Sequence, residues 1–226
     1  MFQHWTRYLP SAIEIYAVQL PGRANRIDEP LIESIEELAI RLFEPFRLSL
    51  NGTYAVMGVS MGATLAFELC RLLKDSGHEL PRHFFLMGRS PPQVSYRSRL
   101  TNDLSDLQIL NAYDEGAHGI PRDFLRDPDF VEMAARVLKA DLVALENYHF
   151  AGRAGFPFPI TAFGGDRDTV SPFETLKLWA AHTTGDFKLE PFQGGHFAFR
   201  DMNSPFFEKL SRELLILIES LASVSN

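Results

Sequence analysis

The sequence predicts an α/β fold, with a mostly parallel central sheet covered by helices on both faces and one helical insertion. Two observations predict it. Short apolar runs alternate with segments whose apolar residues recur at helical spacing, which is typical of strand–helix–strand units. One stretch, at about residues 92–158, carries only helical patterns and breaks the alternation. We therefore expect residues 1–226 to form a single domain, with the insertion as a lid over the carboxyl ends of the strands.

Five apolar runs are the predicted strands. The first, residues 13–20, alternates apolar and polar side chains and is stopped by Pro21 and Gly22. The other four are short and largely apolar throughout: residues 54–58, 83–88, 160–164 and 187–192. Apolar positions at helical spacing predict helices over residues 34–50, which Pro45 bends or ends, over 61–74 and 206–221, and within the insertion over 104–113 and 130–148.

Composition excludes several classes of protein. Lys and Arg number 22 against 29 Asp and Glu, a formal charge of −7 with no basic run, which argues against nucleic-acid binding. Hydrophobic residues make up 46% of the chain, enough for a sizeable core. Because there is no signal-peptide pattern and no apolar stretch of about 18 residues, we expect a cytoplasmic protein that does not enter a membrane. The single cysteine, Cys70, excludes an internal disulfide, and its helical pattern predicts a packed thiol.

The clearest chemical motif is the run Gly58, Val59, Ser60, Met61 and Gly62. This Gly-x-Ser-x-Gly pattern lies between a predicted strand and a predicted helix, where a sharp turn exposes the serine Oγ above the sheet. The context predicts that Ser60 is the nucleophile of an α/β-hydrolase. A glycine-rich turn whose serine only caps the helix would fit the pentapeptide alone.

A serine hydroxyl needs a nearby base, and the base needs a group that orients it. In this fold an acid and then a histidine follow the serine along the chain. His196 lies in a Gly-Gly-His-Phe loop directly after the last predicted strand. Asp166 and Asp168 both follow the strand predicted at 160–164 and compete for the acid position. Asp168 is better placed to reach the histidine loop, whereas Asp166 suits a turn cap.

These residues predict an acyl-enzyme mechanism. His196 removes the Ser60 proton, Ser60 attacks an acyl carbonyl, and Asp168 holds the imidazole tautomer. The backbone N–H of Met61 supplies one hydrogen bond to the oxyanion. The second donor should precede the first predicted strand, but residues 1–11 contain no glycine-rich turn. We therefore expect a truncated or misassigned start, or another backbone N–H in that role.

Beyond these residues, the chain resembles the type II, or editing, thioesterases that accompany nonribosomal peptide and polyketide synthases. The matching segments extend over nearly the whole chain, and Gln-Leu-Pro-Gly-Arg is much more specific than the Gly-x-Ser-x-Gly pattern. They are residues 18–23 with Arg26, 58–63, Ile120 and Pro121 with 138–141 downstream, 164–168, and 194–197.

The resemblance implies a cytoplasmic enzyme that removes stalled or aberrant acyl groups from the phosphopantetheine arm of carrier proteins. Its triad would be Ser60, Asp168 and His196, with the Met61 N–H in the oxyanion hole. We expect no cofactor and no metal, because the phosphopantetheine belongs to the substrate. We also expect a monomer whose partners are acyl- or peptidyl-carrier domains. Relatives carry an aromatic and glycine-rich turn near the N-terminus that this chain lacks.

The insertion carries residues that suit such a substrate. A few of its phenylalanines could line an acyl pocket, although most fit a core. Its arginines suit either an acidic carrier protein or a solvated face. These residues are Phe124, Phe130, Phe150, Phe156, Phe158, Arg97, Arg99, Arg122 and Arg126.

Two alternatives share the same motifs. One is a hydrolase of free acyl-coenzyme A or carboxylic esters, which the same triad would serve. The other is a catalytically impaired relative that only binds acylated carriers, an alternative raised by the missing N-terminal turn. Comparing carrier-bound with free substrates tests the first, and a fluorophosphonate adduct on Ser60 tests the second.

Overall fold

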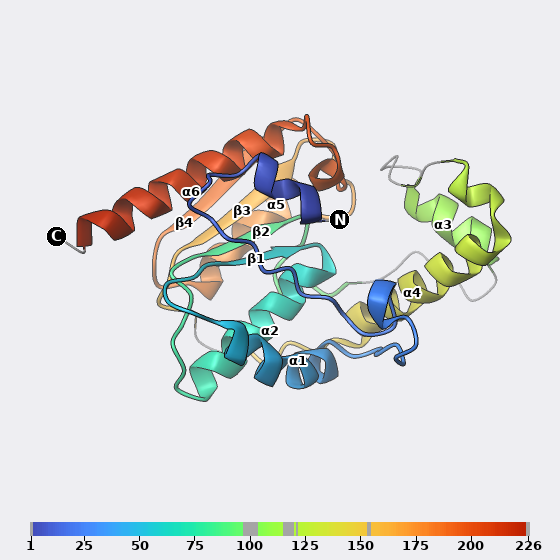
Figure 1. The fold of residues 1–226 in the computed structure, drawn as a ribbon, viewed down its shortest axis with the longest axis horizontal. Helices are drawn as coiled ribbons and strands as arrows, with labels where there is room; N and C mark the ends of the chain where they lie inside the picture. The colour runs from blue at the N-terminus through green and yellow to red at the C-terminus, as the bar shows by residue number, and fades with distance from the viewer. Residues whose placement is uncertain (1, 97–103, 115–119, 121, 153–154, 225–226) are drawn as a thin grey trace.

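A four-stranded parallel sheet forms the centre of the computed structural model, which describes residues 2–96, 104–114, 120, 122–152 and 155–224 (Figure 1). These strands match the four short apolar runs predicted from the sequence. Neighbouring parallel strands require crossover connections, and a helix or the insertion lies in each of them. In spatial order the strands are β1 (Val56–Val59), β2 (Phe84–Met87), β3 (Ile160–Gly165) and β4 (Phe187–Phe192).

Helices cover both faces of the sheet, as the sequence predicts. Outside the insertion they are α1 (Ile35–Ser49), α2 (Met61–Asp75), α5 (Phe173–Leu176) with the 3-10 helix η4 (Lys177–His182), and α6 (Pro205–Val224). One face packs against α2 and the α5–η4 segment, and the other packs against α6. Helix α1 forms an outer layer against α2. Figure 1 shows α6 and α2 on opposite sides of the strands.

Strand β2 shows how the side chains divide between the two faces. Phe84 and Leu86 belong to the core shared with α2, whereas Phe85 and Met87 belong to the core beneath α6. All four are buried, because a parallel strand with helices on both sides meets no water. Cys70 of α2 is also buried, as predicted, and its burial raises the pKa of the thiol above the ordinary value.

The predicted strand at residues 13–20 is wrong. Within the described residues, this segment is irregular chain with no ladder hydrogen bonds to the four strands. Ile13 and Ile15 pack partly against the core beneath α6, while Tyr16 and Val18 are exposed. The alternation of side chains is therefore real, but a strand also needs a hydrogen-bonded neighbour, which periodicity does not report.

Pro45 does not end α1, which continues to Ser49 with the proline inside it. Ser34 caps the start of the helix by accepting the Glu37 N–H at 3.2 Å. Leu42 and Phe46, on either side of the proline, both pack against the layer formed with α2. This packing holds the helix together where proline removes one main-chain donor.

The described part of the insertion is helical, as predicted. Its helices are α3 (Asp106–Asp114) and α4 (Pro128–Asn147), with a 3-10 turn at Phe124–Arg126 between them. Ala144 and Leu145, near the end of α4, pack against the start of α1. Figure 1 shows α3 and the first half of α4 extending away from the sheet, while the second half of α4 returns toward it. None of the helices within the described ranges is long and apolar enough to cross a membrane.

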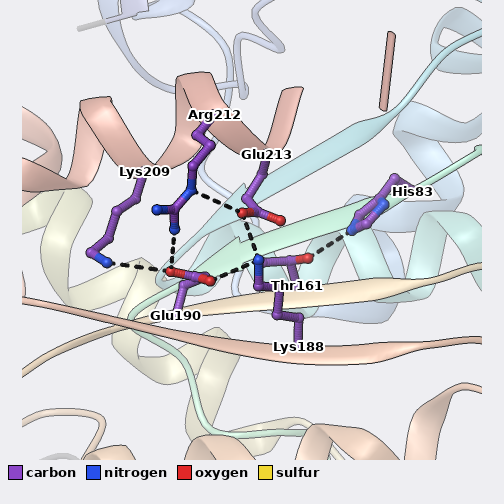
Figure 2. Close-up of polar contacts among 7 residues, drawn as sticks. All are labelled: His83, Thr161, Lys188, Glu190, Lys209, Arg212 and Glu213. Carbon is purple, nitrogen blue, oxygen red and sulfur yellow. Dashed lines mark hydrogen bonds and ion pairs between the residues drawn. The ribbon is translucent and has the colours of Figure 1, made fainter. Parts of the chain in front are cut away.

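A charged layer joins α6 to β4 (Figure 2). Lys188 lies 2.9 Å from Glu190 and 2.8 Å from Glu213, and both carboxylates are nearly buried. Glu190 also pairs with Lys209 at 3.3 Å and with Arg212 at 3.0 Å. Burial raises the pKa of Glu190, but the hydrogen bonds and charges of Lys188 and Lys209 outweigh it and hold that pKa below its ordinary value. The layer therefore fixes α6 on the sheet, and with it the loop between β4 and α6.

Candidate active site

Ser60 lies in the turn between β1 and α2, with a φ of 51° and a ψ of −125°. Residues other than glycine rarely adopt a positive φ, and the strain turns the serine side chain away from the strand. The turn is held by the Ser60 N–H, which donates to the Met87 carbonyl at 2.9 Å. Gly58 makes it possible, because a Cβ there would lie 2.7 Å from the Ala63 nitrogen. The predicted serine turn is thus present, and close strand–helix packing requires the glycine before it.

Three side chains from three loops meet at the carboxyl ends of the strands. His196 Nε2 lies 2.9 Å from Ser60 Oγ, and His196 Nδ1 lies 3.0 Å from Asp168 Oδ2. Asp168 follows β3 and His196 follows β4. Both are buried, with 7% and 3% of their surface exposed. This is the geometry of a hydroxyl nucleophile, a base that can take its proton, and an acid that orients the base.

Asp168 is held in place by its own loop. Its Oδ1 accepts the backbone N–H groups of Val170 and Ser171, each at 2.9 Å, which leaves Oδ2 for His196. The competing carboxylate, Asp166, contacts the histidine loop elsewhere and accepts the Gly194 N–H at 2.8 Å. Of the two acids, the structure therefore brings Asp168 to the imidazole.

Gly88, which sequence reasoning missed, lies against the imidazole. It directly follows β2 with a φ of 66°, and a Cβ there would lie 3.0 Å from both Cε1 and Nδ1 of His196. The same Cβ would lie 3.4 Å from Asp168 Oδ2. The sequence does carry a signal for Gly88. It is a glycine at the end of a buried strand, at the edge of the sheet where the Ser60 turn also forms.

Arg89, the residue after Gly88, is buried and fixes this part of the site to three other segments. Its Nε donates to Thr64 Oγ1 at 3.1 Å, on α2. Its guanidinium carbon lies 4.6 Å from the centre of the Tyr96 ring. Its carbonyl accepts the Trp179 Nε1–H at 2.8 Å. The turn after β2 is therefore anchored to the helix that begins next to Ser60.

Met61 begins α2, so its backbone N–H belongs to the first turn of that helix. The first N–H groups of a helix have no intrahelical acceptor, and the helix dipole favours negative charge there. The Met61 side chain packs with Ile35, Ala144 and Leu145. The predicted donor is thus the residue next to Ser60, and its side chain contacts the end of α4 and the start of α1.

The phenylalanines of the insertion divide into two groups. Phe156 and Phe158 are buried in the core shared with α2, and Phe150 packs partly against it, so the expectation of a core role is right for them. Phe124 and Phe130 lie at the other end of the insertion, where their rings contact each other at 5.0 Å. Phe124 is exposed.

The sequence left carrier docking and a solvated face open for four arginines of the insertion, and two of the four fall within the described residues. Arg122 and Arg126 are exposed, and Arg126 pairs with Asp123 at 3.2 Å on the surface. Arg97 and Arg99 lie outside the described residues. The docking role of these arginines stays a prediction.

The parallel sheet, the strained serine turn and the three hydrogen-bonded side chains define a serine hydrolase of the α/β-hydrolase fold. The chain belongs to the thioesterase domain family, which matches it over residues 1–214. The enzyme is therefore a serine hydrolase that acts on thioesters.

Known relatives agree with this assignment. The thioesterase PikA5 of Streptomyces venezuelae is 33% identical, over 95% of this chain and 76% of its own length. The RedJ thioesterase of the prodiginine pathway in Streptomyces coelicolor is 31% identical, with a TM-score of 0.84, over 94% of this chain and 84% of that chain. BorB, a type II thioesterase from the borrelidin cluster, is 32% identical, with a TM-score of 0.76, over 88% and 80%. The predicted fold and the resemblance to type II thioesterases are both confirmed.

Proposed function

We propose that this chain hydrolyses acyl groups from the phosphopantetheine arm of carrier proteins, and so removes stalled or aberrant units in nonribosomal peptide or polyketide biosynthesis. The observation that carries the proposal is the hydrogen-bonded series from Ser60 through His196 to Asp168. Similarity to thioesterases from the prodiginine pathway and the borrelidin cluster supports the substrate class.

The reaction begins with transfer of the Ser60 proton to His196 Nε2, while Ser60 Oγ bonds to the thioester carbonyl carbon. The carbon–sulfur bond then breaks, the imidazolium returns its proton to the departing thiol, and the acyl group stays on Ser60. Water next attacks the ester with His196 as base, which releases a carboxylic acid and restores the serine. Asp168 keeps the Nδ1–H tautomer throughout and stabilises the imidazolium. A thiolate leaves more easily than an alkoxide, so this substrate makes a modest demand on His196 as acid.

The negative charge on the tetrahedral intermediate develops beside the start of α2. The Met61 N–H is the donor that we assign to it, supported by its place in the first turn of the helix. All three side chains of the triad come from one chain, which supports catalysis by a monomer. We assign no cofactor, because these side chains carry every proton transfer in the scheme. We also propose a cytoplasmic location, which the resemblance to type II thioesterases supports.

The experiment compares one acyl group on three carriers: a phosphopantetheinylated carrier protein, coenzyme A, and a nitrophenyl ester. We expect kcat/KM to be at least about tenfold higher for the carrier protein, because its surface adds binding energy that the free substrates lack. The Ser60→Ala variant is the matched control and should be inactive on all three. Equal efficiency on the free substrates would overturn the carrier-protein assignment, and carrier binding without hydrolysis would favour the binding-only alternative.

A further inference from the structure

Two of the sequence segments that resemble the family take no part in the chemistry at Ser60, yet the structure joins them. Arg23 lies in the Pro-Gly-Arg turn, and Asp141 lies on α4, 118 residues later. Arg23 Nη1 donates to Asp141 Oδ2 at 2.8 Å, and Nη2 donates to Oδ1 at 2.9 Å. This is a bidentate pair, the most orientation-specific contact between these two groups. Their side chains are only 19% and 21% exposed.

The turn that presents Arg23 is itself held by hydrogen bonds. The Gly22 N–H donates to the Arg26 carbonyl at 2.9 Å, and Arg26 Nη1 donates to the Gln19 carbonyl at 2.7 Å. Arg26 also pairs with Glu29 at 2.6 Å. Arg23 therefore extends from a closed turn and reaches Asp141 without ordering a free loop.

On α4, Asp141 shares a face with the residues that approach the nucleophile. Ala144 and Leu145 follow it by three and four positions, which places them one turn further along the same face. Both pack in the small core that includes Met61, the residue after Ser60. The Arg23–Asp141 pair thus fixes α4 one turn away from its contact with the start of α2.

Other contacts show that α4 connects the insertion to the core. Lys139, two residues before Asp141, pairs with Asp106 of α3 at 2.6 Å. Tyr148, just after the helix, donates to Glu68 of α2 at 2.7 Å. Lys139 therefore ties α4 to α3, while Asp141 ties the same part of the helix to the Arg23 turn and Tyr148 ties its end to α2.

The cost of burial favours a geometric role for the pair. Burial raises the pKa of Asp141 above its ordinary value, although Arg23 acts in the opposite direction. A charge pair removed from water gains little net stability, because desolvation offsets the attraction between the charges. Such a pair contributes mainly orientation, which a bidentate contact supplies.

We propose that Arg23 and Asp141 are positioning residues, whose bidentate pair sets α4 beside Met61 and so fixes one wall of the acyl-binding site. This inference rests on the proposed function, because it assigns α4 to the surface that the acyl chain meets. Ser60, His196 and Asp168 do not depend on α4 for their mutual hydrogen bonds.

The test uses Arg23→Met, Arg23→Lys and Asp141→Asn in the full chain. Hydrogen exchange of residues 128–147 should accelerate by about tenfold, and KM for long-chain acyl thioesters should rise by a similar factor. Exchange in β1–β4, kcat, and the rate at which a small fluorophosphonate labels Ser60 should stay within about twofold. Lysine keeps the charge but cannot form the fork, so Arg23→Lys should behave like Arg23→Met. Arg41→Met, which breaks an exposed pair with Glu37 on α1, is the matched control and should change none of these quantities.

Unchanged exchange in α4, or faster exchange in all strands with an unchanged KM, would overturn the inference. Rescue of the normal KM by Arg23→Lys would also overturn it, since charge alone would then suffice. If Arg23→Met does not fold, Arg23→Lys carries the test. Hydrogen exchange is measured without substrate, so it decides the positioning of α4 independently of activity. If the unsubstituted protein fails to hydrolyse acyl-carrier protein, that result counts against the proposed function alone.

Discussion

The carboxylate of Asp166 accepts the backbone N–H of Gly194 at 2.8 Å and ties the loop that carries Asp168 to the loop that carries His196. A second bond runs alongside it, from the Arg167 N–H to the Gly194 carbonyl at 2.9 Å. Asp166 therefore supports the histidine loop, whereas Asp168 contacts the imidazole itself.

We therefore expect substitutions of Asp168 and of Asp166 to lower kcat by different amounts. Asp168→Asn should lower kcat by about 10⁴, because the wrong tautomer of His196 is then favoured. Asp166→Ala should lower it by only about tenfold, through a less ordered loop, and Asp166→Asn by less, because the amide oxygen still accepts the Gly194 N–H. Steady-state kinetics on one acyl thioester measures all three. An equal or greater loss at Asp166 would show that the roles are reversed.

A second prediction concerns the space beside the imidazole. Gly88→Ala should lower kcat by about 10², because the added Cβ displaces the His196 ring and small misplacements of catalytic groups are costly. Gly52→Ala is the matched control. Gly52 has the same φ of 66°, but a Cβ there meets nothing within 4 Å. Both variants should lose about 1 kcal/mol of stability from the positive φ, and only Gly88→Ala should lose activity. Full activity in Gly88→Ala would contradict the account of this contact.

A third prediction concerns pH and His83. Its Nε2 lies 2.8 Å from Thr161 Oγ1, in the contact drawn in Figure 2. Its ring stacks on Phe85 with the ring centres 4.0 Å apart. Burial lowers the pKa of His83 from its ordinary value of 6.5 to about 4. Between about pH 4 and 6.5 the unfolded chain therefore binds a proton at His83 that the folded chain does not bind. The contribution of neutral His83 to the free energy of unfolding is complete above pH 6.5 and is lost as the pH falls toward 4.

Denaturant unfolding between pH 7.5 and 4.5 tests this prediction. The difference in free energy of unfolding between the unsubstituted protein and His83→Gln should shrink as the pH falls, by about 1.4 kcal/mol for each unit between the folded and unfolded pKa values. Burial also lowers the pKa of His182 to about 4, so His182→Gln should show the same trend. A difference that stays constant over this range would contradict the burial of a neutral His83.

The sequence predicted the sheet well because its four strands are short, largely apolar runs that carry local signals, and β2 and β3 are buried at every position. The run at 187–192 coincides with β4, and the run at 160–164 falls one residue short of β3. It failed at residues 13–20, where the alternation was correct but the strand partner is a long-range property. It also missed α5 and η4, because a four-residue helix followed by a 3-10 helix shows too little periodicity.

In the candidate site, too, some residues were predictable from local sequence and others depend on the folded structure. Ser60 and His196 were predictable because turn residues next to a strand mark them locally. The choice between Asp166 and Asp168 depends on the N–H groups of Val170 and Ser171, whose direction is set only in the folded loop. The pairing of Arg23 with Asp141 spans 118 residues, and no periodicity reports it.

We infer that Ser60 carries the acyl group during turnover, and this acyl-enzyme can be trapped. The protein is mixed with an acyl-carrier protein, quenched in acid within seconds, digested, and analysed by mass spectrometry. We expect the acyl mass on the peptide that contains Ser60, and neither adduct nor hydrolysis in Ser60→Ala. Hydrolysis by Ser60→Ala at the rate of the unsubstituted protein, with no acyl group on Ser60 of the unsubstituted protein, would contradict this acyl-enzyme mechanism.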